Sequence, residues 1–375
     1  PLIGFYLGRP EEAFAAITLI ISLALIVFSA ISLRAIGQGP SAAVWVIWLR
    51  RFLRLHGPGE RRRPARQVWA NPIAWVEARA RVNRFGGILA RWSFVVIGVG
   101  LAAVLLLLYH NSELPRVTVQ SGTVSQDRVF RWMLLGILLV ELAIIVLVAI
   151  YMSASSVSRE REDGTLDLLL STPITPNQYI WGKMRGLVSF LGTMFSVPVL
   201  TLAMVAIYTV IGNWLQWPQS TVSVTTGAGA RARAPLLYSE VVLLMPLMLV
   251  PFLALCVAVG MSWSLNAKNV LGAVVPSVGI LGALMVVLGF CGMSVVEVPL
   301  VGPMINAFSP TTNVVMLLDP WQTIDGFADA PGNGRLGMTV AAFVAGAGYS
   351  FIVYVLIQGM VRGFDHTVRR LSGTT

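Results

Sequence analysis

Seven long apolar runs constrain this chain more than any other feature of its sequence. Each run can cross a hydrocarbon core of about 30 Å as a helix that rises about 1.5 Å per residue. The sequence therefore predicts an all-α polytopic membrane protein. The runs lie near Phe14–Leu33, Phe94–Tyr109, Trp132–Ala154, Leu187–Gly212, Val241–Ser262, Leu271–Phe290 and Met338–Met360.

The composition agrees with a membrane protein. Of the 375 residues, 56% are hydrophobic and only 12% are charged, whereas soluble proteins carry about 25% charged residues. The two cysteines, Cys256 and Cys291, lie in or at the end of apolar runs. They indicate neither a disulfide framework nor a metal site.

The basic residues predict the orientation of the chain in the membrane. The net charge is +10, and of the 27 Lys and Arg residues 20 fall in segments 34–92, 158–185, 263–270 and 361–375. Cytoplasmic loops are rich in Lys and Arg, so these segments are assigned to the cytoplasm. The N-terminus is then outside and the C-terminus inside a bacterial-type cytoplasmic membrane, and the clustering argues against nucleic acid as a partner.

A dense polar stretch, Ser158–Arg185, separates the third and fourth apolar runs and reads SREREDGTLDLLLSTPITPNQYIWGKMR. We expect a short loop at one membrane face. Gly164 can end the incoming helix because glycine tolerates φ > 0. Thr165 is a candidate N-cap for a brief leucine-rich helix that Pro173 ends. The run Thr175-Pro176-Asn177-Gln178 has the capping pattern that begins the next helix.

This stretch resembles the loop between the second and third core spans of ABC transporter permeases of the ABC-2 exporter type. The resemblance rests on Glu160-x-Glu162-x-Gly164-Thr165-Leu166-x-x-Leu169-Leu170-x-x-Pro173, followed by Gly182-Lys183. It implies a coupling helix that sits in a cleft of a separate ATP-binding subunit. The alternative is that this stretch is an ordinary charged cytoplasmic loop. The residues assigned to ATPase coupling are Glu160, Arg161, Glu162, Asp163, Gly164, Thr165, Leu166, Asp167, Leu169, Leu170 and Pro173.

The segment before the second run has two parts. Residues 41–56 have Trp45, Trp48 and Phe52 at helical spacing, which predicts either an amphipathic helix on the inner leaflet or a basic tether. Asn71 and Pro72 then open a second helix as cap and first residue. ABC-2 permeases often carry such a connecting helix before their first core span. Its residues assigned to the interface are Asn71, Pro72, Trp75, Glu77 and Arg79.

No catalytic or metal site is expected in this chain. Gly182-Lys183 fails as a phosphate-binding loop, because Asn177 stands where glycine is needed and Met184 follows the lysine. ATP and Mg would therefore be held by the partner ATPase. Glu141 lies about 14 Å into its span, near the midplane, where a charge is costly. It is either a substrate or proton site in the pathway, or a protonated structural residue.

These inferences give a permease with six core spans and one preceding span. The domains are residues 1–36 as an N-terminal span, 37–92 as a basic interfacial segment, and 93–375 as the permease, with a coupling loop at 158–185 and an outer helical loop at 291–337. We expect the first span to belong with an upstream part of a longer or tandem permease. The expected partners are an ABC ATP-binding subunit, a second permease unit (homo- or heterodimer) and membrane lipid. The alternative is an ATP-independent secondary transporter or a membrane scaffold subunit.

Overall fold

The computed structural model describes residues 71–75, 77, 85–114, 118–119, 122–162, 164, 174–225, 231–267, 269–294, 301–324 and 331–372, besides Leu19, Ser22 and Leu23. The chain divides into two compact units, Pro1–Gln67 and Val68–Thr375. Apart from its three helical positions Leu19, Ser22 and Leu23, the predicted first span lies outside the described residues, as does the candidate amphipathic helix at 41–56. The architecture below is that of the second unit.

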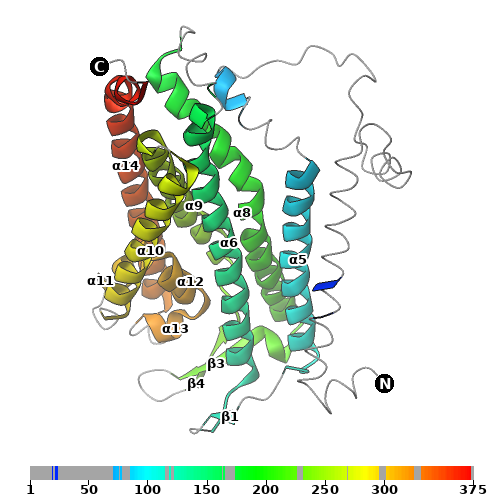
Figure 1. Ribbon diagram of the computed structural model, residues 1–375. Coiled ribbons are helices and arrows are strands. Elements are labelled where there is room, and N and C mark those ends of the chain that lie inside the picture. The colour runs from blue at the N-terminus through cyan, green and yellow to red at the C-terminus, as the bar shows by residue number, and fades with distance from the viewer. Residues whose placement is uncertain are drawn as a thin grey trace. The chain divides into compact units, whose positions relative to one another are not determined.

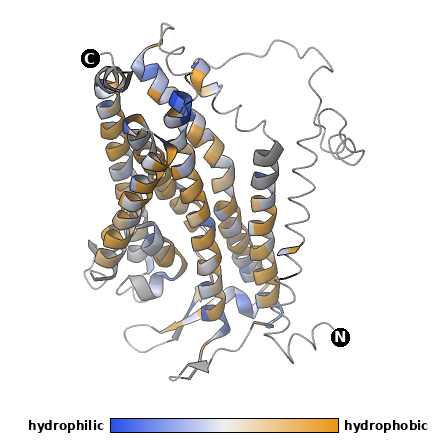
Figure 2. Ribbon diagram, in the orientation of Figure 1, coloured by the Kyte–Doolittle hydropathy of each residue, from blue (hydrophilic) through white to orange (hydrophobic). Residues whose placement is uncertain are grey.

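Six long helices form this unit and confirm the predicted all-α polytopic fold. All six contain a stretch long and apolar enough to cross a membrane, and they match the second to seventh apolar runs. They run alongside one another, apolar along their middles and polar at their ends (Figures 1 and 2). The helices are α5 (Phe85–His110), α6 (Gln126–Glu162), α8 (Pro176–Trp214), α9 (Val241–Asn266), α10 (Val270–Ser294) and α14 (Pro331–Ser372).

The polar stretch 158–185 contains the end of one helix and the start of the next, as the caps predicted at Gly164 and Thr175 indicate. Helix α6 continues through its charged residues to Glu162, and α8 begins at Pro176. An apolar run marks only the part of a helix that lies in hydrocarbon. Polar residues can extend the helix beyond that part where other helices form hydrogen bonds or ion pairs with their side chains. We call the end of the bundle that holds Glu162 and Pro176 the loop end, and the opposite end the hairpin end.

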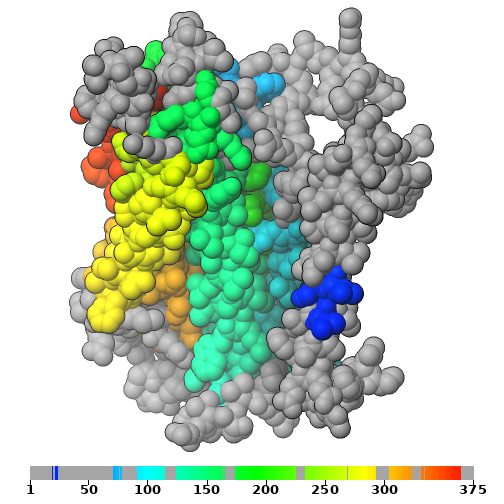
Figure 3. All heavy atoms as spheres, viewed as in Figure 1, coloured from blue at the N-terminus to red at the C-terminus, as the bar shows by residue number. Residues whose placement is uncertain are grey.

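Helix α9 is the centre of the bundle. It packs most extensively against α6 and α14. In the most apolar stretch of α9, 61% is buried, whereas the corresponding share is 22% for α5 and 17% for α10. The contact with α6 is close because Gly260 has no side chain: a Cβ there would overlap with Ser153 Oγ. Helices α5 and α10 are therefore peripheral, and α10 forms much of the face shown in Figure 3.

Two small antiparallel hairpins lie at the hairpin end. Strand β1 (Thr118–Val119) pairs with β2 (Gly122–Thr123), and β3 (Thr221–Thr225) pairs with β4 (Arg231–Pro235). The 3₁₀ helix η1 (Pro218–Ser220) leads into β3. The sequence analysis did not anticipate either hairpin, since both are too short to give a period-2 pattern of buried residues.

Three short helices connect α10 to α14, in the segment where prolines break the apolar pieces. They are α11 (Val301–Phe308), α12 (Pro310–Leu318) and α13 (Pro320–Thr323), and prolines stand at the start of the last two. Arg131 of α6 holds this segment in place. Its guanidinium lies 2.8 Å from Asp319 Oδ1 and 3.0 Å from Asp127 Oδ2, over the ring of Trp321. Burial raises the pKa of the Asp319 carboxyl, and the Arg131 guanidinium opposes that rise.

Candidate functional site

The chain turns between α6 and α8 through two defined helix caps. Gly164 has φ 66°, in the left-handed region, and its N–H donates to the carbonyl of Arg161 at 3.0 Å. On the other side, the Gln178 N–H donates to Thr175 Oγ1 and the Thr175 N–H donates to Gln178 Oε1, both at 3.3 Å. Pro176 occupies the first helical position. Both caps confirm the prediction from sequence, because capping patterns are local.

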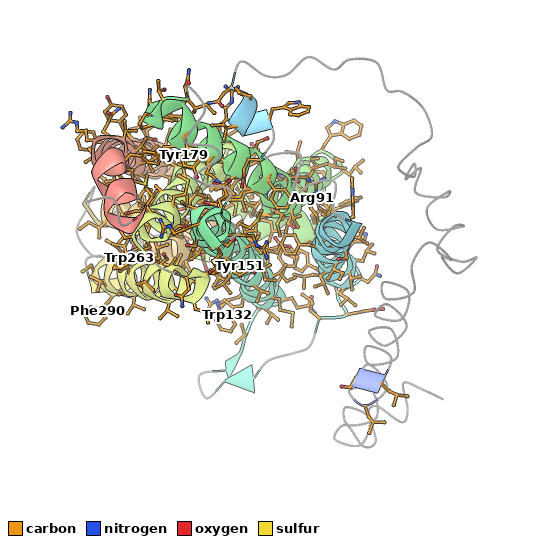
Figure 4. All side chains as sticks on the ribbon, turned by 45° about the horizontal axis from the view of Figure 1, so that its top comes forward. Arg91, Trp132, Tyr151, Tyr179, Trp263 and Phe290 are labelled. Carbon is orange, nitrogen blue, oxygen red and sulfur yellow. The ribbon has the colours of Figure 1, made fainter. Side chains whose placement is uncertain are left out.

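A buried lysine joins the two helices next to this turn. Lys183 of α8 is 1% exposed, and its Nζ lies 2.7 Å from Glu160 Oε1 and 2.9 Å from the carbonyl oxygen of Ser156. The Tyr179 hydroxyl donates to the other carboxylate oxygen of Glu160 at 2.6 Å. Figure 4 shows Tyr179 near the start of α8. Glu160 on α6 thus accepts from two side chains one turn apart on α8.

The segment 71–77 packs against the same part of α8. Asn71 caps it as predicted, with Oδ1 accepting from the N–H groups of Ile73 and Ala74. Its Nδ2 donates to the carbonyl of Gln178 at 2.8 Å. This close approach of segment 71–77 to α8 requires glycine at position 182, because a Cβ there would lie 2.8 Å from Asn71 Oδ1.

Glu77 completes the cluster of charges. Its Oε2 lies 3.9 Å from Lys183 Nζ, so the ammonium group faces two carboxylates. Pro72 and Trp75 lie in the helical part of segment 71–77, and Arg79 lies outside the described residues. A buried ammonium group between two carboxylates suits a permanent structural contact.

The last charges of α6 bind the neighbouring helix ends. Arg161 donates to the carbonyls of Ala267 and Leu265 at the end of α9, at 2.5 and 2.8 Å. Glu162 Oε1 accepts from the N–H of Val270 at the start of α10, at 3.3 Å. A cation near free carbonyls and an anion near free N–H groups both satisfy helix ends. We call residues Glu77, Ser156, Glu160, Arg161, Glu162, Tyr179 and Lys183 the polar clamp.

The clamp changes the interpretation of the predicted coupling residues. Glu160, Arg161 and Glu162 make contacts within the chain, and Gly164 is exposed at the turn. Asp163, Thr165, Leu166, Asp167, Leu169, Leu170 and Pro173 lie outside the described residues. The sequence analysis considered Lys183 as part of the family motif and as part of a failed phosphate-binding loop, and did not predict its contact with Glu160. The sequence did carry one signal for this contact: Tyr179 and Lys183 are four residues apart and therefore lie on one face of a helix.

Glu141 lies apart from the clamp, in the middle of α6. It is 4% exposed and faces α5 and α8. Among the described residues no group of three or more His, Cys, Asp or Glu side chains could hold a metal ion. The clamp joins five segments of the chain through partnered side chains, so its arrangement suits the transmission of movement between helices.

Most of the chain matches a known protein family. Residues 71–362 match the family model described as ABC-2 family transporter protein. The match begins at Asn71, the cap of the segment that packs on α8, and spans the clamp and the apolar parts of all six long helices. No curated protein matches the chain.

Proposed function

Because the chain belongs to the ABC-2 transporter family, we propose that it is the transmembrane permease subunit of an ATP-driven exporter. As a multi-pass membrane protein with six apolar helices, it would form the substrate pathway. A separate ATP-binding subunit would hold ATP and Mg and would dock on the loop between α6 and α8.

The observation that carries this proposal is the polar clamp at both ends of that loop. Glu160 before the loop and Lys183 after it are 2.7 Å apart. Arg161 and Glu162 attach the same turn to α9 and α10. A partner that pushes on the loop would therefore move α6, α8, α9 and α10 together. Coupling needs such a rigid body, because switching in proteins commonly proceeds by rigid movements of packed elements.

The loop also carries apolar residues that suit docking. Leu166, Leu169 and Leu170 lie in the stretch between Gly164 and Pro173. Leucines on a polar loop favour a partner that buries them, at about 25 cal/mol per Å². In this proposal these leucines contact the ATP-binding subunit, with Asp163, Thr165 and Asp167 as polar contacts beside them.

A second permease unit would complete the transporter. The low burial of α5 and α10 supports a role for these helices at the lipid or at the second unit, with the pathway where two units meet. The loop end would face the cytoplasm, because Lys and Arg concentrate in the segments there. The membrane would be a bacterial-type cytoplasmic membrane.

Co-purification with the ATPase tests the proposal. Leu166→Asp combined with Leu169→Asp should weaken ATPase binding about a hundredfold or more, because each buried leucine contributes about 1.5–3 kcal/mol. The matched control is Leu215→Asp, at an exposed position just after α8 at the hairpin end. It should leave binding unchanged.

Two measurements decide between outcomes once membrane insertion is confirmed. They are the amount of ATPase that co-purifies with each variant and the substrate-stimulated hydrolysis of the complex. If the double variant matches the unmutated chain in both, the loop is not the coupling element. Ion-driven uptake by the chain alone in vesicles would instead identify a secondary transporter.

A further inference from the structure

Glu141 is a buried carboxyl group that the proposed function does not use. It lies in α6, and the residue is 4% exposed. It comes nine residues after Trp132, which places it about 14 Å from Trp132 along the helix axis and near the middle of the apolar stretch. Both of its carboxyl oxygens are buried without a hydrogen-bond partner among the described residues.

Three residues of α5 and α8 surround this carboxyl group. A Cβ at Gly98 of α5 would lie 2.8 Å from Glu141 Oε1 and 2.5 Å from Val197 Cγ1. Thr201 of α8 lies near the carboxyl group, and its Oγ1 is likewise buried without a hydrogen-bond partner among the described residues. The absence of a side chain at Gly98 thus leaves the room that the carboxyl group occupies.

In the described parts of α5, α8, α9, α10 and α12, no charged side chain lies at the level of Glu141 along the bundle. Each charge or titratable side chain on α5 and α8 lies toward one end of its helix. Helices α9 and α10 add only the thiols of Cys256 and Cys291. The charged or titratable side chains of α5 and α8 toward the loop end are Arg91, Tyr179, Lys183 and Arg185. Those toward the hairpin end are Tyr109, His110 and Tyr208.

Arg91 is the one cation of α5, and it is engaged elsewhere. It lies two helical turns before Gly98, donates to Thr193 Oγ1 at 3.5 Å and stacks over the ring of Phe190. It is therefore not a counter-ion for Glu141. An unpaired carboxylate in this position costs at least about 3 kcal/mol.

We propose that Glu141 is a proton-binding site in the middle of the membrane, formed by α5, α6 and α8. The carboxyl group carries its proton at pH 7, and its O–H can donate a hydrogen bond to Thr201 Oγ1, which has no other hydrogen-bond partner among the described residues. A metal ion suits the site less well, because cations such as Ca²⁺ take about six to eight oxygen ligands. The described side chains here offer one carboxyl group and one hydroxyl.

A protonated carboxyl in an apolar environment has a diagnostic reaction with an apolar carbodiimide. The acid adds across one C=N bond of N,N′-dicyclohexylcarbodiimide: a carboxyl oxygen bonds to the carbodiimide carbon and the proton moves to nitrogen. The O-acylisourea then rearranges to a stable N-acylurea, so the peptide gains the whole mass of the reagent. A carboxylate without its proton does not react in this way.

The test uses the full chain in membrane vesicles at pH 7, analysed by peptide mass spectrometry. We expect the adduct on the peptide that contains Glu141, and none on that peptide in Glu141→Gln. The exposed Glu113 is the internal control, which should react with a water-soluble carbodiimide and not with the apolar reagent. Labelling of Glu141 should fall by about tenfold or more when the vesicles are raised to strongly alkaline pH.

Infrared spectroscopy of the purified chain gives a second, independent readout. The C=O stretch of a protonated carboxyl group should be present at pH 7 and absent from Glu141→Gln, while Thr201→Val should shift its frequency. No adduct together with no carboxylic acid band would overturn the proposal. Neither measurement involves the ATPase, so failure here is separate from failure of the coupling loop.

Discussion

Lys183 connects three parts of the loop end, namely α8, α6 and segment 71–77. It is 1% exposed and contacts Glu160, Ser156 and Glu77. Removing one partner of a buried pair costs about 3–5 kcal/mol, but Glu160 is partly exposed and keeps the Tyr179 hydroxyl. We therefore expect Lys183→Met to destabilise the chain by about 2 kcal/mol, measured from thermal unfolding in detergent.

The matched comparison for Lys183→Met uses the same substitution at an exposed cation. Arg159→Met on α6 should leave the unfolding midpoint unchanged, because Arg159 is exposed. Combining Lys183→Met with Glu160→Gln should recover part of the loss, since the second change removes the negative charge that Lys183 balanced. Equal midpoints for Lys183→Met and Arg159→Met would show that the buried ion pair contributes nothing to stability.

Gly98 and Gly100 form a natural pair of test positions on α5. A Cβ at Gly98 would meet Val197 at 2.5 Å and Glu141 at 2.8 Å, whereas at Gly100 nothing lies within 4 Å. We expect Gly98→Ala to destabilise the chain by about 1–3 kcal/mol through overpacking. Gly100→Ala should be neutral or slightly stabilising, because alanine favours helix. Thermal unfolding of both variants checks this, and a midpoint for Gly98→Ala at or above that of Gly100→Ala would contradict it.

The residues that the sequence predicted correctly are those with local causes. The caps at Asn71, Gly164 and Thr175 depend on neighbours within four positions, so their patterns are readable. The pairing of Lys183 with Glu160 crosses a loop and depends on how two helices lie side by side. A single sequence carries no direct record of such long-range contacts.

At the scale of elements, the loop between α6 and α8 depends on the direction in which α6 ends. Gly164 has φ 66°, and no atom of the described residues would lie within 4 Å of a Cβ there. Gly164→Val should misdirect the loop, because a β-branched residue at φ > 0 is strained by about 1–2 kcal/mol. We expect reduced co-purification of the ATPase with an unchanged yield of inserted chain.

A variant with asparagine at the same position separates conformation from size. Asparagine tolerates the left-handed region, so Gly164→Asn should retain most of the binding that Gly164→Val loses. If both substitutions reduce ATPase binding equally, the side chain blocks the partner and the backbone conformation is not the cause. If neither reduces it, the turn does not position the loop.

The apolar runs predicted the helices and the caps predicted where α6 ends and α8 begins, but neither showed what stabilises the polar end of α6. Long apolar runs require helices in a membrane, so six spans could be assigned from sequence. Helix α6 extends beyond its apolar run because Arg161 and Glu162 find partners at the ends of α9 and α10. Those partners are known only once the helices are placed together.

At the scale of the whole molecule, the bundle has a protected centre and two exposed margins. Helix α9 is surrounded by α6, α8, α10 and α14, while α5 and α10 bury only about a fifth of their apolar windows. Exposed side chains such as Trp132, Tyr151 and Phe290 (Figure 4) belong to this outer surface. An apolar surface of this extent is stable in lipid and would not be in water.

The orientation of the bundle is the last prediction. Lys and Arg gather in the loop-end segments, so we expect the loop end inside and the hairpin end outside. Two exposed positions report on the two ends: Glu113 follows α5 at the hairpin end, and Arg159 lies in the last turn of α6. With Cys291 replaced by serine, a membrane-impermeant maleimide should label Glu113→Cys on intact cells. It should label Arg159→Cys only after the membrane is permeabilised, and Cys256, which is fully buried, should stay unlabelled in both. The reverse pattern would place the loop between α6 and α8 outside the cell, where no cytoplasmic ATPase could reach it, and the coupling proposal would fail with the orientation.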